Sequence, residues 1–172
     1  MILDRPARNV LLLALCQALA VTGNAVVLTV AALAGYMLAE DKSLATLPLA
    51  LQFTATMAAT IPASLLMKRI GRRAGFSLGV LVAAAGGAVS SFAIFTANFP
   101  LFCLGAAIYG GFNGFALFYR FAAADTASDA FRGKAISLVV TGGVLAAFAG
   151  PELAIWSRGW FEATMAMVLA NG

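Results

Sequence analysis

The stretch Val10–Ala39, VLLLALCQALAVTGNAVVLTVAALAGYMLA, runs for 30 residues without a charged side chain. A helix needs about 20 apolar residues to cross the hydrocarbon core of a bilayer. This stretch therefore predicts a membrane helix that is tilted or extends past the bilayer. The preceding Asp4–Arg8 segment resembles the start of a signal peptide. A cleavable apolar region has only about 7–15 residues, so we expect an uncleaved first helix.

Further apolar runs follow the first one. Leu44–Met67 has 24 uncharged residues, and Ala74–Tyr119 has 46. A single helix of 46 residues would be about 69 Å long, more than twice the thickness of the hydrocarbon core. We expect the chain to turn at Asn98-Phe99-Pro100, because proline cannot continue a helix. The expected spanning helices are about 10–39, 44–67, 74–97, 100–124 and 133–156, with an incomplete sixth at 160–172.

The composition agrees with these spans. Hydrophobic residues make up 62% of the 172 residues and charged residues only 10%. Soluble domains are about 45–50% apolar and about 25% charged, so this chain has too little polar surface to be one. The same ratio excludes a disordered segment. The sequence predicts an all-α polytopic membrane helix bundle that occupies residues 1–172 as a single domain.

The residue inventory argues against an enzyme. Histidine is absent, and with it the Ser-His and Cys-His nucleophile pairs and the histidine metal sites. Cys16 and Cys103 are far apart, and there is no CxxC spacing. The phosphate-binding pattern GxxxxGK[ST] is also absent, so the sequence gives no indication of a nucleotide-driven pump. We therefore predict no catalytic residue, no metal and no cofactor.

The basic residues predict the orientation of the chain. An N-terminus in the cytoplasm places eight Lys and Arg residues on the cytoplasmic side, against Lys42 and Arg158 on the other. This is a strong positive-inside signal, and in so apolar a chain it indicates membrane orientation rather than nucleic-acid binding. Arg120 lies near the cytoplasmic end of the fourth expected helix, either as a snorkelling side chain or as a functional intramembrane charge. The eight cytoplasmic residues are Arg5, Arg8, Lys68, Arg69, Arg72, Arg73, Arg132 and Lys134.

The segment Ser64–Arg73, SLLMKRIGRR, joins the second and third expected helices. It resembles the G-x-x-x-D-R-x-G-R-R loop motif of the major facilitator superfamily. A very short turn between two helices favours glycine. Ser64 replaces the usual glycine, and Lys68 replaces an aspartate that takes part in a conformational lock in that family. This lock must be absent here or rebuilt with an acid elsewhere. The matching residues are Arg69, Gly71, Arg72 and Arg73.

Two further segments carry the resemblance. Asp125 and Arg132 lie in a stretch that looks like the family's connection between helices 4 and 5. Gly150 and Pro151 retain the Gly-Pro step of its exporter signature, although a kink that serves only packing would look the same. The family's helix 4 arginine is missing, since Ala106 stands in its place.

The resemblance implies the N-terminal half of a twelve-helix fold. In that family two six-helix halves bind a substrate between them near the membrane midplane. This chain supplies five helices and the start of a sixth, and it stops at Gly172 inside that unfinished helix. We therefore expect a partial chain whose partners are the lipid bilayer, a small-molecule substrate and a missing C-terminal half.

Polar residues inside the spans are the candidates for the wall of a substrate cavity, because such side chains should face protein or water. Helices 1, 2, 4 and 5 line the cavity in the resembled family. The alternative is that these groups only hydrogen-bond between helices. The candidates are Gln17, Asn24, Gln52, Tyr109 and Asn113.

The leading hypothesis, which the resemblance implies, is secondary active transport of a small solute by alternating access in a bacterial inner (plasma) membrane. The Gly-Pro step favours export. The alternative is a small multi-span protein that has a structural or partner-binding role and transports nothing. A channel of several copies is disfavoured because no helix shows a regularly polar pore face.

Overall fold

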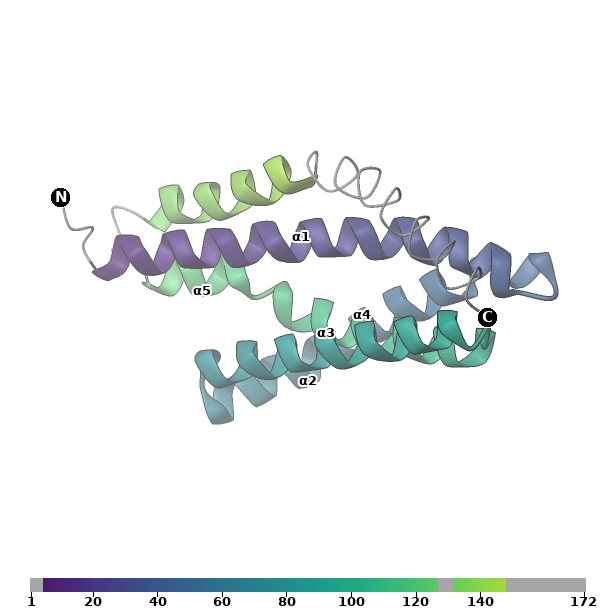
Figure 1. Ribbon diagram of the computed structural model, residues 1–172. Coiled ribbons are helices and arrows are strands. Elements are labelled where there is room, and N and C mark those ends of the chain that lie inside the picture. The colour runs from purple at the N-terminus through teal and green to yellow at the C-terminus, as the bar shows by residue number, and fades with distance from the viewer. Residues whose placement is uncertain (1–4, 127–131, 148–172) are drawn as a thin grey trace.

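The computed structural model describes residues 5–126 and 132–147 (Figure 1). This part of the chain contains helices and turns but no strand, so the predicted all-α class is confirmed. The 132–147 segment is also helical. The elements are α1 (Arg5–Leu38), the short 3₁₀ helix η1 (Lys42–Leu44), α2 (Leu47–Ile70), α3 (Arg72–Phe95), α4 (Phe99–Ala116) and α5 (Tyr119–Thr126).

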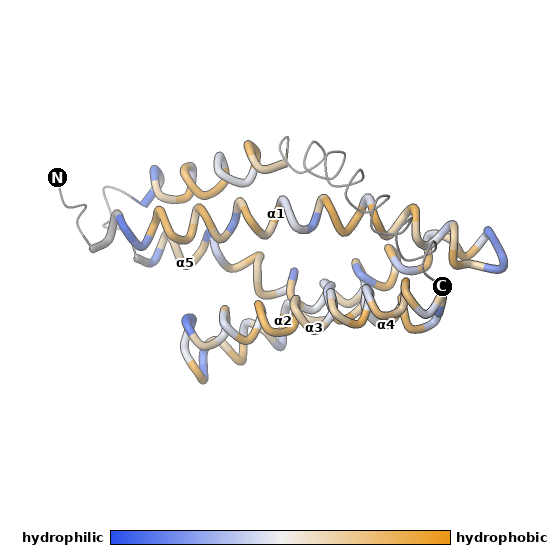
Figure 2. The backbone as a smooth tube through the Cα atoms, in the orientation of Figure 1, coloured by the Kyte–Doolittle hydropathy of each residue, from blue (hydrophilic) through white to orange (hydrophobic). Residues whose placement is uncertain are grey.

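Four stretches of the described chain are long and apolar enough to cross a membrane. The fifth expected span, 133–156, is described only as far as residue 147, and the partial sixth at 160–172 lies outside the described residues. Figure 2 shows apolar residues along the helices and hydrophilic ones gathered toward their ends. Large apolar side chains such as Leu19, Met57 and Phe95 are exposed, as a lipid-facing surface requires. The four stretches are Arg8–Leu38, Lys42–Ile70, Arg72–Phe95 and Phe99–Asp125.

The connection between α1 and α2 is stabilised by polar contacts of Asp41 and Lys42. Lys42 donates from Nζ to the carbonyl oxygens of Tyr36 and Ala39, at 2.7 and 2.9 Å, and so caps the last turn of α1. The Asp41 carboxylate accepts a hydrogen bond from the backbone N–H of Ser43 at 2.9 Å. This bond favours the charged form and lowers the pKa of Asp41. A sharp reversal between the two helices results.

The predicted turn at Asn98-Phe99-Pro100 is present. Asn98 is the N-cap of α4, and its side chain accepts a hydrogen bond from the Leu101 N–H at 2.9 Å. Pro100 follows in the first turn, where its missing N–H costs no helical hydrogen bond. The chain therefore leaves α3 and enters α4 within a few residues.

The expected helix at 100–124 is not continuous. The structure ends α4 at Ala116 and begins α5 at Tyr119, with two turn residues, Leu117 and Phe118, between them. The reason is tertiary, because α4 packs on α2 and α3, whereas α5 packs on α1. Figure 1 shows the chain stepping between these two groups at this break.

The described helices form two packed groups. In the first, α4 lies against α2 and α3. Small residues allow this close contact: a Cβ on Gly110 would overlap the backbone oxygen of Gln52, and one on Gly86 would lie 2.6 Å from the backbone nitrogen of Tyr109. In the second, α1 packs against α5 and the 132–147 helix. The core of this second group consists of Val10, Ala14, Ala123, Ala135 and Val139.

Candidate functional site

Three amide side chains from three helices meet between the two helix groups. Asn24 of α1 accepts two hydrogen bonds on its Oδ1 atom. One comes from Nε2 of Gln52 in α2 at 2.9 Å, and the other from Nδ2 of Asn113 in α4 at 3.0 Å. The structure thus brings together three of the five cavity candidates. We call Asn24, Gln52 and Asn113 the amide cluster.

The amide cluster lies deep within the expected spans. Asn24 is near the middle of the Arg8–Leu38 span, and Asn113 is near the middle of Phe99–Asp125. Polar groups at this depth are costly unless they are paired or face a water-filled path. Gln52 is completely buried, whereas Asn24 and Asn113 are only half-buried. The two asparagines are therefore the members that a solute could reach.

Tyr109 and Thr56 adjoin the amide cluster. Tyr109 lies one turn before Asn113 on α4, and its hydroxyl lies so close to α1 that a Cβ on Gly23 would be 3.2 Å from it. The Thr56 hydroxyl donates to the Gln52 carbonyl at 2.9 Å and also lies 3.0 Å from the Gly110 carbonyl. The fourth candidate, Tyr109, thus lies beside Asn24.

The amide cluster contains an unpaired acceptor. The Oε1 atom of Gln52 is buried and has no hydrogen-bond partner among the described residues. Nearly all buried polar atoms in folded proteins have a partner, so each exception needs an explanation. Asn24 Nδ2 and Asn113 Oδ1 likewise form no hydrogen bond with a described residue.

The fifth candidate, Gln17, lies apart from the amide cluster. It lines a cavity of about 250 Å³ between α1, the α4–α5 break and the 132–147 helix. Arg120 lines the same cavity, with its guanidinium 5.2 Å from the centre of the Phe121 ring. Gln17 is seven residues before Asn24, so the two residues share a face of α1. Gln17 nevertheless lies about two turns nearer the N-terminus, which separates it from the amide cluster.

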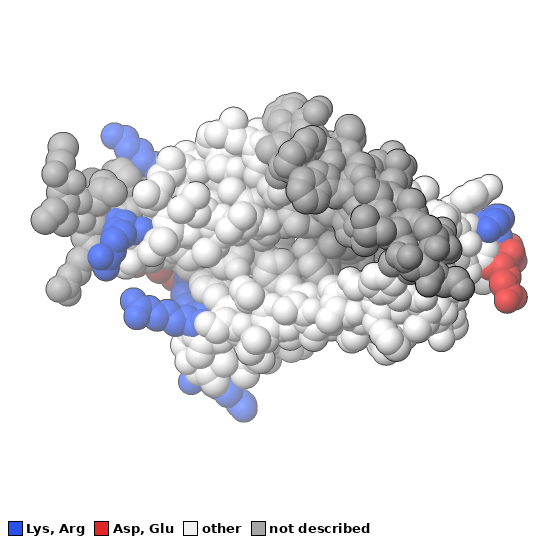
Figure 3. All heavy atoms as spheres, viewed as in Figure 1, with Lys and Arg blue, Asp and Glu red and all other residues white. Residues whose placement is uncertain are grey.

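The loop motif forms a tight turn at one end of the bundle. Gly71 separates α2 from α3 and has φ +85° and ψ 157°, a conformation that is essentially restricted to glycine. Arg69, Arg72 and Arg73 flank this turn, and all three are exposed. Figure 3 shows that Lys and Arg gather at this end, while acidic residues appear with a lysine at the opposite end.

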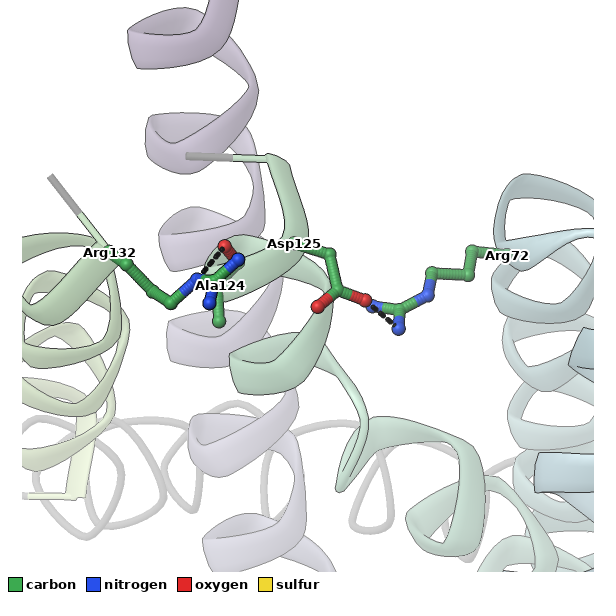
Figure 4. A network of polar contacts seen from close by, with 4 residues as sticks. All are labelled: Arg72, Ala124, Asp125 and Arg132. Atoms are coloured by element: carbon green, nitrogen blue, oxygen red, sulfur yellow. Dashed lines mark hydrogen bonds and ion pairs between the residues drawn. The ribbon is translucent and has the colours of Figure 1, made fainter. Parts of the chain in front are cut away.

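An ion pair connects this turn to α5. Arg72 Nη2 pairs with Asp125 Oδ2, and Figure 4 shows the two side chains reaching toward each other from α3 and α5. On the other side of the same segment, Arg132 Nε donates to the Ala124 carbonyl at 3.3 Å. Residues from three helices are thereby joined near the basic end. Gly150 and Pro151 lie outside the described residues.

Some residues that shape the site were not among the sequence-based candidates. Gly110 and Gly23 matter because they leave room for a neighbouring helix, and Thr56 because it joins α2 to α4. The four-residue spacing of Gln52 and Thr56 is visible in the sequence. Nothing in the sequence indicated which glycines face another helix.

One comparison with known proteins found a similar protein, and that protein is a transporter. The chain is 40% identical over 151 residues to one such protein, the riboflavin transporter RfnT of Brucella anthropi. The match covers 88% of this chain but 38% of the relative, so the chain spans little more than a third of the relative's length. No family model and no solved structure matches the chain. The relative is a transporter, which agrees with the expectation that the chain is not an enzyme.

Proposed function

We propose that the chain is part of a secondary transporter that moves riboflavin, or a solute of similar chemistry, across a membrane. The observation that carries this proposal is the 40% identity to a riboflavin transporter along 88% of the chain. The four apolar helices supply the membrane-spanning body that transport requires. The amide cluster supplies hydrogen-bonding groups at mid-membrane depth, where a polar solute must be desolvated.

The mechanism that we propose is alternating access within a fold of the major facilitator type. Support comes from the R-x-G-R-R order around Gly71 and from its tight helix–turn–helix geometry. The division of the described helices into two groups, joined by the amide cluster and by the Arg72–Asp125 pair, offers contacts that can break and reform as the protein changes shape. We propose a bacterial inner membrane and a cytoplasmic N-terminus, because the basic residues gather at the end that would then face the cytoplasm.

The test is transport by the full-length protein in bacteria that cannot make or import riboflavin. We expect the protein to support growth on low riboflavin and to take up radiolabelled riboflavin. Export by the same protein is measured as the release of radiolabelled riboflavin from preloaded cells. If the protein moves riboflavin in neither direction, the proposed solute is wrong. Transport of a solute of similar chemistry and a structural or partner-binding role would then be the two remaining hypotheses.

Substitutions on α1 test whether the amide cluster takes part in transport. Asn24→Ala removes the acceptor that serves both Gln52 and Asn113, so we expect transport to fall while the protein still reaches the membrane. Thr29→Val is the matched change on α1, because the Thr29 hydroxyl donates only to the Ala25 carbonyl of its own helix, at 3.0 Å. We expect this variant to transport normally.

A further inference from the structure

Arg120 is a charged side chain on the wall of a cavity inside the membrane-spanning part of the chain. The cavity has a volume of about 250 Å³ and lies between α1, the α4–α5 break and the 132–147 helix. Gln17 is the other polar side chain among the described residues that line it. The rest of this wall consists of valine, leucine, alanine and glycine residues. One cation and one amide therefore share an otherwise apolar site.

No acid among the described residues neutralises Arg120. The structure describes three acidic residues, and two of them lie in the connection between α1 and α2, at the end of α1 that lies away from α5 (Figure 1). The third, Asp125, pairs with Arg72. The Arg120 guanidinium lies 5.2 Å from the centre of the Phe121 ring, which compensates a full positive charge only in part. A cation in apolar surroundings is costly unless an anion pairs with it, so the cavity is suited to an anionic ligand.

The position of Arg120 along the span favours a lipid headgroup as that ligand. Arg120 lies five residues before Asp125 on α5, which is about 7.5 Å along the helix axis from the basic end. Its side chain is exposed, and an arginine can extend its guanidinium to the headgroup level while its methylene groups stay in apolar surroundings. Leu117 and Val144 on the cavity wall are also exposed, so this wall continues onto the apolar surface of the bundle. A phospholipid matches both features, because it carries a charged headgroup on apolar chains.

We propose that the cavity binds the headgroup of an anionic phospholipid from the leaflet at the basic end. The Arg120 guanidinium donates to the phosphate oxygens, which its planar fork of N–H groups fits well. Gln17 forms no hydrogen bond with a described residue, so its amide can donate to an ester oxygen of the same lipid. The leucine and valine side chains contact the first methylene groups of the acyl chains. This site goes beyond the proposed function, because it needs no assumption about the transported solute.

The experiment offers two lipids in competition to the purified full-length protein in detergent. Phosphatidylglycerol is anionic and phosphatidylcholine is zwitterionic, and the two are supplied in equal amounts with identical acyl chains. Native mass spectrometry counts the molecules of each lipid that stay bound. We expect the unaltered protein to prefer phosphatidylglycerol about fivefold or more, because one basic residue near the membrane surface contributes about that factor.

Three variants test whether that preference arises in the cavity. Arg120→Gln removes the charge but keeps a polar side chain, and it should reduce the preference about fivefold. Gly143→Leu keeps Arg120 but fills the cavity, since a Cβ on Gly143 would lie 3.5 Å from the side chains of both Gln17 and Val21. It should reduce the preference by a similar factor. Arg73→Gln is the matched control, because Arg73 is exposed at the same end of the bundle and does not line the cavity. It should keep the preference within about twofold.

Two more variants separate the contacts from the fold. Arg120→Lys keeps the charge and should retain most of the preference, which shows that the site depends on a cation at this position. Gln17→Leu removes the contact to the ester oxygen, which both lipids carry. It should weaken binding of both lipids by a similar factor and leave the preference between them intact. Thermal unfolding of every variant in the same detergent identifies any that fail to fold.

The outcomes decide the proposal without reference to riboflavin. A preference that is unchanged in Arg120→Gln or in Gly143→Leu would overturn the lipid site, and Arg120 would then be a side chain that only snorkels to water. Displacement of bound phosphatidylglycerol by an equal concentration of glycerol phosphate would assign the cavity to a soluble anion and would overturn the lipid site as well. A preference that both cavity variants lose, that Arg73→Gln keeps and that glycerol phosphate does not abolish establishes the site.

Discussion

Arg72 at the start of α3 and Asp125 near the end of α5 form an ion pair, although they are 53 residues apart in the chain. The pair connects the group of α2, α3 and α4 with the group of α1, α5 and the 132–147 helix. Lys68 replaces the aspartate of the resembled loop motif, and Asp125 supplies an acid at the same end of the molecule. We therefore expect this pair to bias the equilibrium between transporter conformations.

The first prediction concerns this pair. The two side chains are 43% and 60% exposed, so breaking the pair should change the free energy of unfolding by less than about 1 kcal/mol. Asp125→Asn should nevertheless lower the transport rate about fivefold or more if the pair couples the two groups. The reversed pair, Arg72→Asp with Asp125→Arg, should recover much of that loss. Uptake and thermal stability measured on the same preparations separate the two effects.

Arg73→Ala is the control for the ion pair, because Arg73 is an exposed neighbour that forms no ion pair with any described residue. Arg73→Ala and Arg72→Ala each remove one positive charge from the turn between α2 and α3. Equal losses of transport in Arg73→Ala and Arg72→Ala would show that the total positive charge matters and that the pair does not.

The second prediction concerns the contact between α2 and α4. Gly110→Ala would drive a methyl group into the backbone of Gln52, so we expect a loss of about 1–3 kcal/mol of stability. Gly111→Ala is the matched control, because its methyl group would meet only the side chain of Val82 at 3.5 Å. Thermal unfolding in detergent should rank Gly110→Ala well below Gly111→Ala. Equal melting temperatures would contradict the close packing of these helices.

The comparison of these neighbouring glycines also shows what sequence reasoning could and could not find. The spans and the turn at Asn98 follow from apolar length, proline and capping, which are local properties. The break at Leu117-Phe118 has no glycine or proline to mark it, and it arises because α5 packs against α1. Tertiary contacts of that kind leave no local signal in a single sequence.

The candidate site was predictable to a similar extent. Helical spacing identified Asn24, Gln52, Tyr109 and Asn113 as polar residues within spans, and the structure brings them together. Spacing on one helix could not show which helices meet. Gln17 therefore shares a face with Asn24 but lies apart from the amide cluster, in the cavity that Arg120 also lines.

The third prediction tests the backbone at Gly71. No atom lies within 4 Å of a Cβ placed there, yet the φ of +85° with ψ 157° is strained for any other residue. Gly71→Ala should therefore cost about 1–3 kcal/mol through backbone strain alone. Gly133→Ala has equally open space and no positive φ, so it should be neutral or slightly stabilising. A Gly71→Ala protein as stable as the Gly133→Ala protein would show that the turn can relax.

The fourth prediction tests the orientation of the chain in the membrane. Cys16 and Cys103 are first replaced by serine. A single cysteine is then introduced by Glu40→Cys, in the connection between α1 and α2, or by Lys68→Cys, in the last turn of α2. The positive-inside distribution predicts that Lys68 faces the cytoplasm. A maleimide that cannot cross the membrane should label intact cells only through the cysteine at position 40. Labelling at position 68 alone would reverse the topology and place the basic turn, with its Arg72–Asp125 pair, on the outer side.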